Sequence, residues 1–145
     1  MEKNLLELLK ERMISAPFAK HMGITIQDIA PGYAIAEARY SEKMCSFHGL
    51  MHGGAIFALI DEAFAAAANS HGTMALALNM NVTFIKPPQI DSILIAEAKE
   101  ESRSERTATY RIEVRQRGEN GDQTIAVCQA LVYRKDKKLS FLEGD

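Results

Sequence analysis

The sequence predicts an α+β fold in which an antiparallel sheet wraps around one long, apolar helix. Two observations predict it: a run made almost entirely of Ala, Ile, Leu and Phe follows the glycine pair at 53–54, and six strand-like segments are separated by short turns. Consecutive strands joined by short turns favour an antiparallel sheet. A helix that is apolar nearly all round must also be covered nearly all round, which a curved sheet achieves together with a second subunit.

Prolines and glycines mark where the expected elements begin and end. Pro17 helps to end a short helix, the pair Pro31-Gly32 makes a turn between two strands, and Pro87-Pro88 stops a third strand. The expected elements, in chain order, are a helix over 3–14, strands over 23–30 and 33–40, a central helix over about 54–70, and strands over 75–86, 92–101, 106–117 and 123–134.

Segment 75–86 has the clearest strand pattern. Its sequence, ALALNMNVTFIK, alternates between apolar and smaller or polar side chains. Strict alternation puts Met80 on one face with the Leu, Val and Phe side chains. It puts Ala77 on the opposite face with the Asn and Thr side chains.

Length and composition fit a single globular domain over residues 1–145. The chain is 47% hydrophobic and 25% charged, and its formal net charge of −2 and lack of Trp argue against a nucleic-acid surface. No apolar stretch reaches the roughly 20 residues of a membrane span. The amino-terminal segment carries acids and has no cleavage site typical of a signal peptide. Because the two cysteines form no disulfide framework, we expect a reduced, cytoplasmic protein without a membrane partner.

The glycine pair forms a candidate oxyanion-binding site. Gly53 and Gly54 have no side chains to block approach, so their N–H groups can face a ligand oxygen at the positive end of the helix dipole. This is the arrangement of an oxyanion hole or an anion cradle. Glycines also precede helices for purely structural reasons, so the pair alone leaves both interpretations open.

Two acids, Asp61 and Glu62, interrupt the most apolar helix, and helical periodicity does not choose between them. A buried carboxylate is costly unless it is paired, although either acid can reach solvent at the edge of the helix. Asp61 lies about 12 Å beyond Gly53 along the helix axis. A base and an oxyanion donor must each lie within about 3 Å of the atom they serve. We therefore expect a two-fold dimer that pairs each acid with the partner's glycines.

The stretch HGGAIFALIDEAFAAAANS, from His52 to Ser70, resembles the signature of the hotdog-fold thioesterases, and most of all the phenylacetate-degradation (PaaI-type) acyl-CoA thioesterases. The likeness covers most of the chain, including the segment NVTFIKPP and the order of strands. It implies five to six antiparallel strands around one long helix, assembled as a homodimer and a homotetramer built as a dimer of dimers. It also implies hydrolysis of acyl-CoA to the free acid and CoA without a metal or a bound cofactor.

By position, the resemblance assigns the site residues. Asp61 becomes the carboxylate that acts as nucleophile or general base, and the Gly53 N–H, with Gly54, polarises the thioester carbonyl. His48 and His52 lie in the loop that shapes the site. In this family the glycine helix start and the acid come from different subunits, in agreement with the distance argument.

Two positions depart from the family pattern. Ser46 stands where relatives often carry Asn; a serine can still donate a hydrogen bond to the catalytic site, with shorter reach. Ala77 stands where some relatives carry a Ser or Thr thought to help hold the water. Both departures leave the carboxylate and the oxyanion donors in place, and both bear on rate and substrate.

Further residues are candidates for binding the substrate. Arginines gather over 102–115, where alternating charge on an exposed strand most often marks a solvated surface. In the resemblance, however, the turn after Arg103 lies where CoA phosphates often dock, and arginine suits phosphate by its fork of donors. Aryl, medium-chain and branched acyl groups all fit the expected apolar pocket. The candidates are Arg103, Arg106 and, more weakly, Lys86 for the phosphates, with Phe57 and Asn69 elsewhere in the substrate site.

Two other chemistries are less favoured. His48, His52 and His71 suggest a metal site, but His48 and His52 are four residues apart in a glycine-rich loop and no convincing third ligand is evident, so we expect no metal. Cys45 could act as a thiolate nucleophile, but an idle thiol is far commoner.

The leading hypothesis is an acyl-CoA thioesterase that works across a dimer interface, with attack by Asp61 and activation of water both open. The alternative is a non-catalytic acyl-CoA binding or sensing protein on the same fold, supported by Ser46 and Ala77. A hotdog hydratase is less favoured, because the usual hydratase histidine motif is missing.

Overall fold

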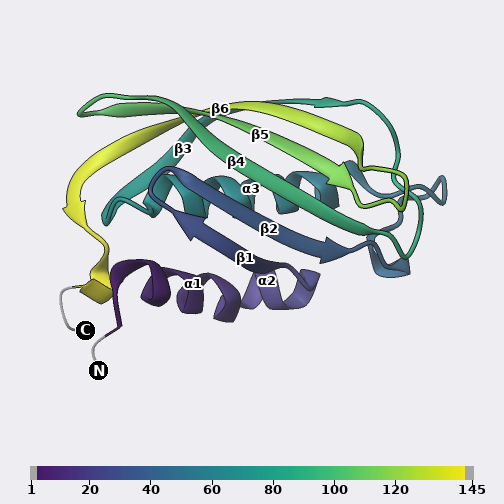
Figure 1. Cartoon of the computed structure of the whole chain (residues 1–145), viewed down its shortest axis with the longest axis horizontal. Helices are drawn as coiled ribbons and strands as arrows, with labels where there is room; N and C mark the ends of the chain where they lie inside the picture. Colours follow the sequence, from purple (N-terminus) through teal and green to yellow (C-terminus); the bar gives the residue numbers. More distant parts are fainter. Residues whose placement is uncertain (1–2, 143–145) are drawn as a thin grey trace.

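The computed structural model describes residues 3–142, which form one curved antiparallel sheet around a central helix (Figure 1). The six strands lie in the order β1-β2-β4-β5-β6-β3, so the predicted α+β class is confirmed. In chain order the elements are α1 (Leu5–Ser15), α2 (Pro17–Met22), β1 (Thr25–Ala30), β2 (Tyr33–Arg39), α3 (Gly53–Asn69), β3 (Thr73–Phe84), β4 (Ile93–Arg103), β5 (Thr107–Gln116) and β6 (Gln123–Lys138), with 3₁₀ turns at Glu42–Met44 and Ser140–Leu142.

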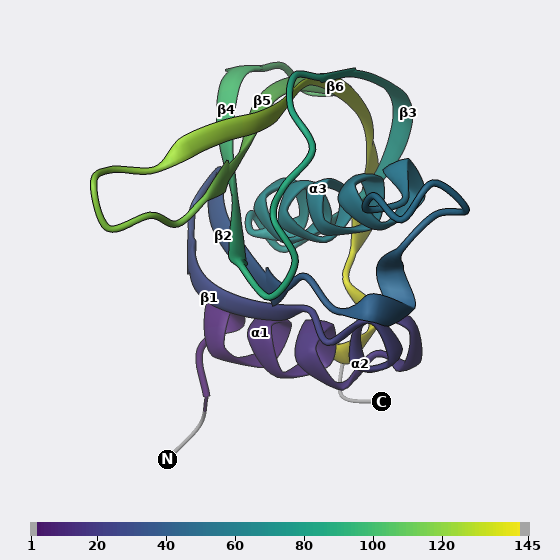
Figure 2. The same ribbon diagram turned by 90° about the vertical axis from the view of Figure 1, so that its right-hand side faces the viewer.

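α3 lies inside the curve of the sheet because both surfaces carry small side chains (Figure 2). Alanines on α3 and on the strands let the two backbones pack closely. Phe64 of α3 fills the space against Tyr110 of β5, with ring centroids 5.5 Å apart in an edge-on arrangement. The fully buried alanines of this contact are Ala63, Ala66 and Ala67 on α3, Ala34 and Ala36 on β2, and Ala96 and Ala98 on β4.

The first two helices cover a side of α3 that the sheet leaves open (Figure 2). α1 packs on β1 and α3 and buries Leu9, and α2 buries Ala19. These helices bring apolar side chains to the core, which adds hydrophobic stabilisation. No helix within residues 3–142 is long and apolar enough to cross a membrane.

The second helix is the one helix of the described chain that the sequence analysis missed. Pro17 was expected only to end the first helix, but it also begins α2 as a first-turn residue, where its missing N–H costs nothing. Gly23 then ends α2 in the left-handed conformation, with φ of 69°. β1 therefore begins at Thr25 and not at residue 23 as predicted.

β3 forms one edge of the sheet, with β6 as its neighbour. A register shift between Ala77 and Asn79 breaks the strict alternation expected along this strand. The ladder pairs Ala77 with Val132 and Met80 with Ala130, and both partners on β6 are buried under α3. Ala77 and Met80 thus face the same side, and the prediction that they face opposite sides is wrong. One extra residue in a strand is enough to reverse a face.

Candidate active site

The amino end of α3 presents a backbone donor that residues 3–142 leave unused. His52 is the N-cap residue, and its Nδ1 accepts the N–H of Gly54 at 2.8 Å, which leaves the ring proton on Nε2. The His52 carbonyl accepts the N–H of Ala55 at 2.9 Å. The described chain supplies no acceptor for the N–H of Gly53. The free donor at this helix start is therefore Gly53, whereas Gly54 serves the cap.

The two glycines also differ in the space available for a side chain. A Cβ on Gly54 would lie 2.9 Å from Nδ1 of His52, so a side chain there would displace the cap. A Cβ on Gly53 would lie 3.4 Å from the ring of Phe84, which is ordinary van der Waals contact. What distinguishes Gly53 is thus its N–H group and its position against Phe84, at the end of β3.

The loop before α3 holds two of the predicted site residues. The Ser46 hydroxyl accepts the N–H of His48 at 3.3 Å, and the Ser46 N–H donates to the Leu50 carbonyl at 2.6 Å. Ser46 therefore shapes its own loop. His48 is exposed and stacks on Phe47, which is 93% exposed, with ring centroids 3.7 Å apart. The loop leading to Gly53 thus offers an apolar surface to solvent or to another molecule.

The burial of α3 separates Asp61 from Glu62. All residues of α3 are buried except for one stripe along the helix. At about 100° per residue, this stripe spans about half of the circumference, with Asp61 near its middle and Glu62 at its edge. The exposure pattern therefore selects Asp61, which periodicity in the sequence could not do. The stripe consists of Gly53, Gly54, Phe57, Asp61, Glu62, Ala65 and Asn69.

Both acids occupy a partly desolvated environment. Burial raises the pKa of Asp61, and burial together with the charge of Asp61 raises the pKa of Glu62. Glu62 Oε2 is buried without a hydrogen-bond partner in the part of the chain described. Burial, with a further contribution from the Asp61 charge, also raises the pKa of the Cys128 thiol on β6 to about 11. Asp61 is thus close enough to Cys128 on β6 for its charge to act on that thiol.

The other predicted substrate residues lie at separate places. Phe57 is 38% exposed within the stripe, between Gly53 and Asp61. Lys86 is exposed just beyond β3, where its Nζ donates to Gln123 Oε1 at 2.7 Å. Asn69 joins the end of α3 to β3: its amide nitrogen donates to the Ala65 carbonyl at 2.8 Å, and its Oδ1 accepts the Ala75 N–H at 2.9 Å. The Asn69 amide is thus occupied by the fold.

The loop histidines and Cys45 are the residues of the two less favoured chemistries. Within residues 3–142, no three His, Cys, Asp or Glu side chains gather as a metal site. Cys45 Sγ lies 3.2 Å from the Tyr40 hydroxyl. In the described part of the chain, no hydrogen bond joins Cys45 to a histidine.

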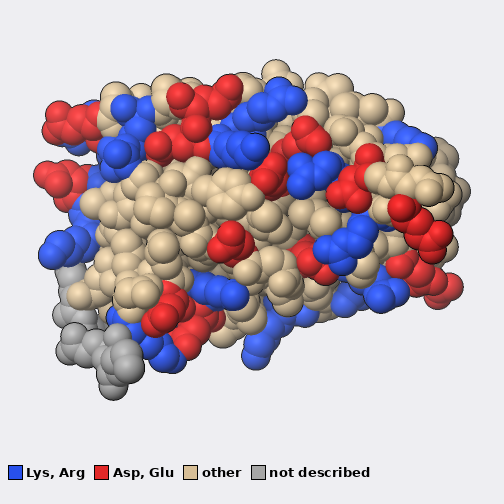
Figure 3. Space-filling model, in the orientation of Figure 1, with Lys and Arg blue, Asp and Glu red and all other residues tan. Residues whose placement is uncertain are grey.

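A basic cluster lies at the opposite end of α3 from Gly53 (Figure 1). Arg103 ends β4, Arg106 lies in the following turn, and Arg134 on β6 donates through Nη1 to the Ser104 carbonyl at 2.6 Å. Lys and Arg side chains are interspersed with Asp and Glu over the face shown in Figure 3. A cavity of about 190 Å³ opens at the basic cluster, lined by Thr73, Glu105, Arg106, Arg134, Lys135 and Asp136.

Comparison with known proteins identifies the family. A sequence model of the thioesterase superfamily matches residues 48–123, which include the glycine helix start and Asp61. The chain belongs to the thioesterase superfamily. An Escherichia coli relative, acyl-coenzyme A thioesterase PaaI, is 34% identical over 96 residues, which cover 66% of this chain and 69% of the relative.

Solved structures of relatives agree with this thioesterase-superfamily assignment. The E. coli PaaI protein from the phenylacetic acid degradation operon superposes with a TM-score of 0.87 at 27% identity, over 94% of this chain and 97% of that one. A mutant of the phenylacetic acid degradation protein PaaI from Thermus thermophilus superposes with a TM-score of 0.77 at 34% identity, over 83% of this chain and 100% of that one. The hotdog fold and the PaaI-type resemblance are thereby confirmed.

Sequence reasoning missed part of the basic cluster. Arg134 and Lys135 lie on β6, and Thr73 begins β3. A signal was present for Arg134: β5 and β6 form a hairpin around GENGD, and continuing its register from the turn brings Arg106 opposite Tyr133, the neighbour of Arg134. The register shift between Val114 and Arg115 then brings Arg134 opposite Arg106. The Arg134 N–H indeed donates to the Arg106 carbonyl at 2.7 Å.

Proposed function

We propose that the protein hydrolyses acyl-CoA thioesters to the free acid and CoA, at sites that each combine groups from two protomers. One observation carries this proposal: the unused N–H of Gly53 and the half-buried carboxylate of Asp61 lie on one open stripe, yet about 12 Å apart along the helix. One carbonyl cannot reach both within a protomer. Membership of the thioesterase superfamily supports the chemistry.

The open surface fits a second copy of the chain. β3 presents a free strand edge beside the stripe, and unpaired strand edges favour pairing with another chain. Apolar side chains surround that edge: Phe57 on α3, Leu76, Leu78 and Phe84 on β3, and Ile85 just beyond it are all more than one third exposed. A homodimer would bury them; the homotetramer stays a prediction from the resemblance.

The symmetry of such a dimer follows from the positions on α3. For each Asp61 to meet the partner's Gly53, the two helices must run antiparallel, with the two-fold axis midway between these residues. The midpoint is Phe57, about 6 Å along the axis from either one. Phe57 would then pack near its own symmetry copy, between the two sites.

The chemistry follows from the groups that meet. The Gly53 N–H, at the positive end of α3, donates to the thioester oxygen and stabilises the negative charge that develops on it. Asp61 of the other protomer either attacks the carbonyl carbon or removes a proton from the attacking water. The carbon–sulfur bond then breaks, and CoA leaves as a thiolate that takes up a proton from the water consumed in the reaction. On the water route this completes the hydrolysis; on the attack route water then hydrolyses the mixed anhydride on Asp61 and releases the free acid. The raised pKa of Asp61 makes it a stronger base than an ordinary carboxylate.

The basic cluster suits the phosphate end of CoA. In the dimer, the carboxyl end of the α3 that supplies Asp61 lies beyond that acid, about 12 Å further at Asn69. The arginines near this end could hold the phosphates while the pantetheine arm crosses to the thioester. Fork-shaped guanidinium groups bind phosphate by paired hydrogen bonds.

A second candidate function is a non-catalytic acyl-CoA sensor on the same fold. Two observations favour it. The Ser46 hydroxyl is engaged by its own loop, and Ala77 faces the α3 side of the sheet without a hydroxyl that could hold water. Such a protein would bind CoA esters and release no thiol.

A free-thiol assay over a panel of acyl-CoAs separates the two. We expect Asp61→Asn to lower kcat/KM by about 10³-fold, since a general base or nucleophile contributes on that order. Glu62→Gln is the matched control, because it removes the neighbouring acid at the edge of the stripe, and it should keep most of the activity. If the wild type turns over no ester faster than Asp61→Asn does, the sensor is the correct function.

A further inference from the structure

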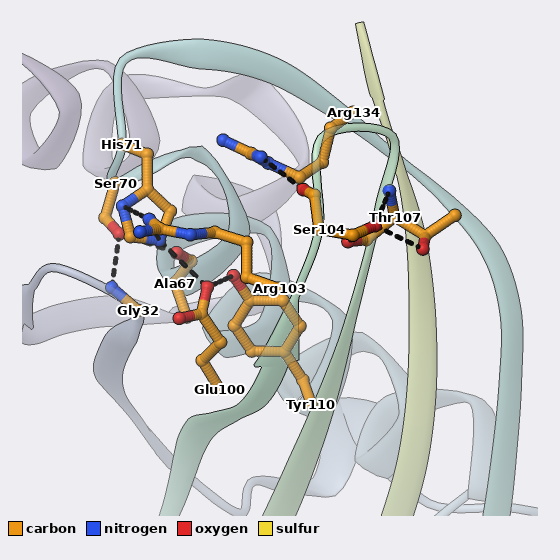
Figure 4. A network of polar contacts seen from close by, with 10 residues as sticks. All are labelled: Gly32, Ala67, Ser70, His71, Glu100, Arg103, Ser104, Thr107, Tyr110 and Arg134. Carbon is orange, nitrogen blue, oxygen red and sulfur yellow. Dashed lines mark hydrogen bonds and ion pairs between the residues drawn. The ribbon is translucent and has the colours of Figure 1, made fainter.

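A polar network joins the end of α3 to the basic cluster (Figure 4). His71, which follows α3, places Nε2 2.9 Å from Glu100 Oε1, and the Tyr110 hydroxyl donates to the same oxygen at 3.0 Å. Arg103 Nη1 lies 2.5 Å from Nδ1 and 2.7 Å from Nε2 of His71, so it rests against the imidazole. The side chains of His71 and Glu100 are only 13% and 21% exposed.

The network holds one edge of the Arg103 guanidinium. Burial alone would raise the pKa of Glu100, but the hydrogen bonds from His71 and Tyr110 and the charge of Arg103 outweigh it and keep this pKa below its usual range. Glu100 Oε1 accepts the hydrogen bond of His71 Nε2, and Arg103 Nη1 lies against the face of the same imidazole. Nη1 is thus engaged, while the described chain supplies no acceptor for Nε or Nη2.

The turn between α3 and β3, which carries His71, is held by hydrogen bonds of Ser70. Ser70, which is 2% exposed, accepts the Gly32 N–H at 2.7 Å and donates to the Ala67 carbonyl at 2.7 Å. The turn that carries His71 is thereby fixed to both α3 and the β1–β2 turn. Gly32, with φ of 71°, lies so close to Glu100 that a Cβ would come within 3.0 Å of the Glu100 Cβ. The position of Glu100 is therefore set by packing as well as by hydrogen bonds.

We propose that His71 and Glu100 are positioning residues that hold Arg103 ready for a phosphate group of the CoA ester. Arg103 is exposed and lies on the same hairpin as Arg106, and Arg106 lines a cavity together with Arg134. A long side chain normally loses rotamer freedom when it binds a ligand, and fixing it beforehand removes that cost. This inference rests on the proposed function, since it assumes that the bound phosphate group belongs to the CoA part of the substrate.

Two substrates with the same acyl group test the inference: the CoA ester and the N-acetylcysteamine ester, which lacks the nucleotide and its phosphates. In Glu100→Gln and His71→Gln we expect KM for the CoA ester to rise by about two- to tenfold with kcat unchanged. Turnover of the N-acetylcysteamine ester should not change. If His71 and Glu100 only stabilised the fold, their replacement would lower the turnover of both esters. Arg111→Ala is the matched control, because it removes an exposed arginine from the same hairpin outside the network.

A double-mutant cycle tests whether the two residues act through Arg103. In the Arg103→Ala background, adding Glu100→Gln should have no further effect on KM for the CoA ester. Additive effects, or equal losses with the short ester, would overturn the inference. If the wild type hydrolyses neither ester, the proposed function fails, and calorimetry with adenosine 3′,5′-bisphosphate then tests the network alone. If Glu100→Gln and His71→Gln leave the affinity for adenosine 3′,5′-bisphosphate unchanged, the inference is overturned in this experiment as well.

Discussion

At the amino end of α3 a backbone donor, the N–H of Gly53, is left without an acceptor in the described chain, and the loop before it exposes Phe47. At the carboxyl end the polar side chains of Asn69 and Ser70 have their hydrogen bonds completed by the fold. Both ends belong to the same buried helix. The amino end thus keeps a donor that can bind the reacting oxygen of a ligand, whereas the polar side chains of Asn69 and Ser70 anchor the carboxyl end of the helix.

Among changes at the two ends of α3, the largest effect should come from removing the open donor alone. Gly53→Pro deletes the N–H but suits the first position of a helix, and His52 already has the extended backbone (φ −64°, ψ 132°) that a following proline requires. We expect kcat to fall by about 10²- to 10³-fold, as for loss of one oxyanion donor. Gly53→Ala keeps the N–H and should stay within about tenfold of wild type. Equal losses in the two variants would show that space, and not the donor, matters at this position.

At the anchored end, the same kind of change should affect stability and not chemistry. Ser70→Ala removes two hydrogen bonds and leaves the Gly32 N–H buried without a partner. The free energy of unfolding should fall by about 2 kcal/mol, as measured by urea denaturation at fixed protein concentration. For folded protein, turnover of the N-acetylcysteamine ester should be kept. A large loss of that turnover would contradict the division between the two ends.

A smaller effect is expected from the acid at the edge of the stripe. The pKa of Glu62 is raised in the folded protein, so its charge disfavours folding above the unfolded pKa and has no effect below it. Glu62→Gln should therefore raise the free energy of unfolding by about 1 kcal/mol at neutral pH, because it removes a poorly paired charge. The gain should fade as pH falls below the folded pKa and vanish near about pH 4. A wild type more stable than the variant at neutral pH would contradict this interpretation.

The sequence predicted the elements with long, regular patterns and failed where one residue changes the geometry. α3 is a long apolar run and the six strands are bounded by turn residues, and their predicted bounds lie within a few residues of those observed. The bulge after Ala77 has no Gly or Pro to mark it, so the face of Ala77 was predicted wrongly. The helix Pro17–Met22 is too short for periodicity, although its Pro and Gly boundaries were visible.

The family motif predicted the candidate residues and their roles, whereas the residue pattern alone did not distinguish the two glycines or the two acids. The motif named Gly53, Gly54 and Asp61 together. Only the hydrogen bond from Gly54 to His52 separates the capping glycine from the free donor, and only the burial of α3 puts Asp61, and not Glu62, at the centre of the open stripe. The difference between Gly53 and Gly54 and that between Asp61 and Glu62 both depend on contacts that form only in the folded chain.

The central claim is that each site takes Gly53 from one protomer and Asp61 from the other, and a mixed dimer tests it most directly. Asp61→Asn and Gly53→Pro chains are co-expressed with different affinity tags, and the heterodimer is purified through both. It contains one site with both groups intact and one site with neither, so we predict about half of the wild-type activity per dimer, from parents that are nearly inactive. A heterodimer as inactive as its parents would contradict the shared site.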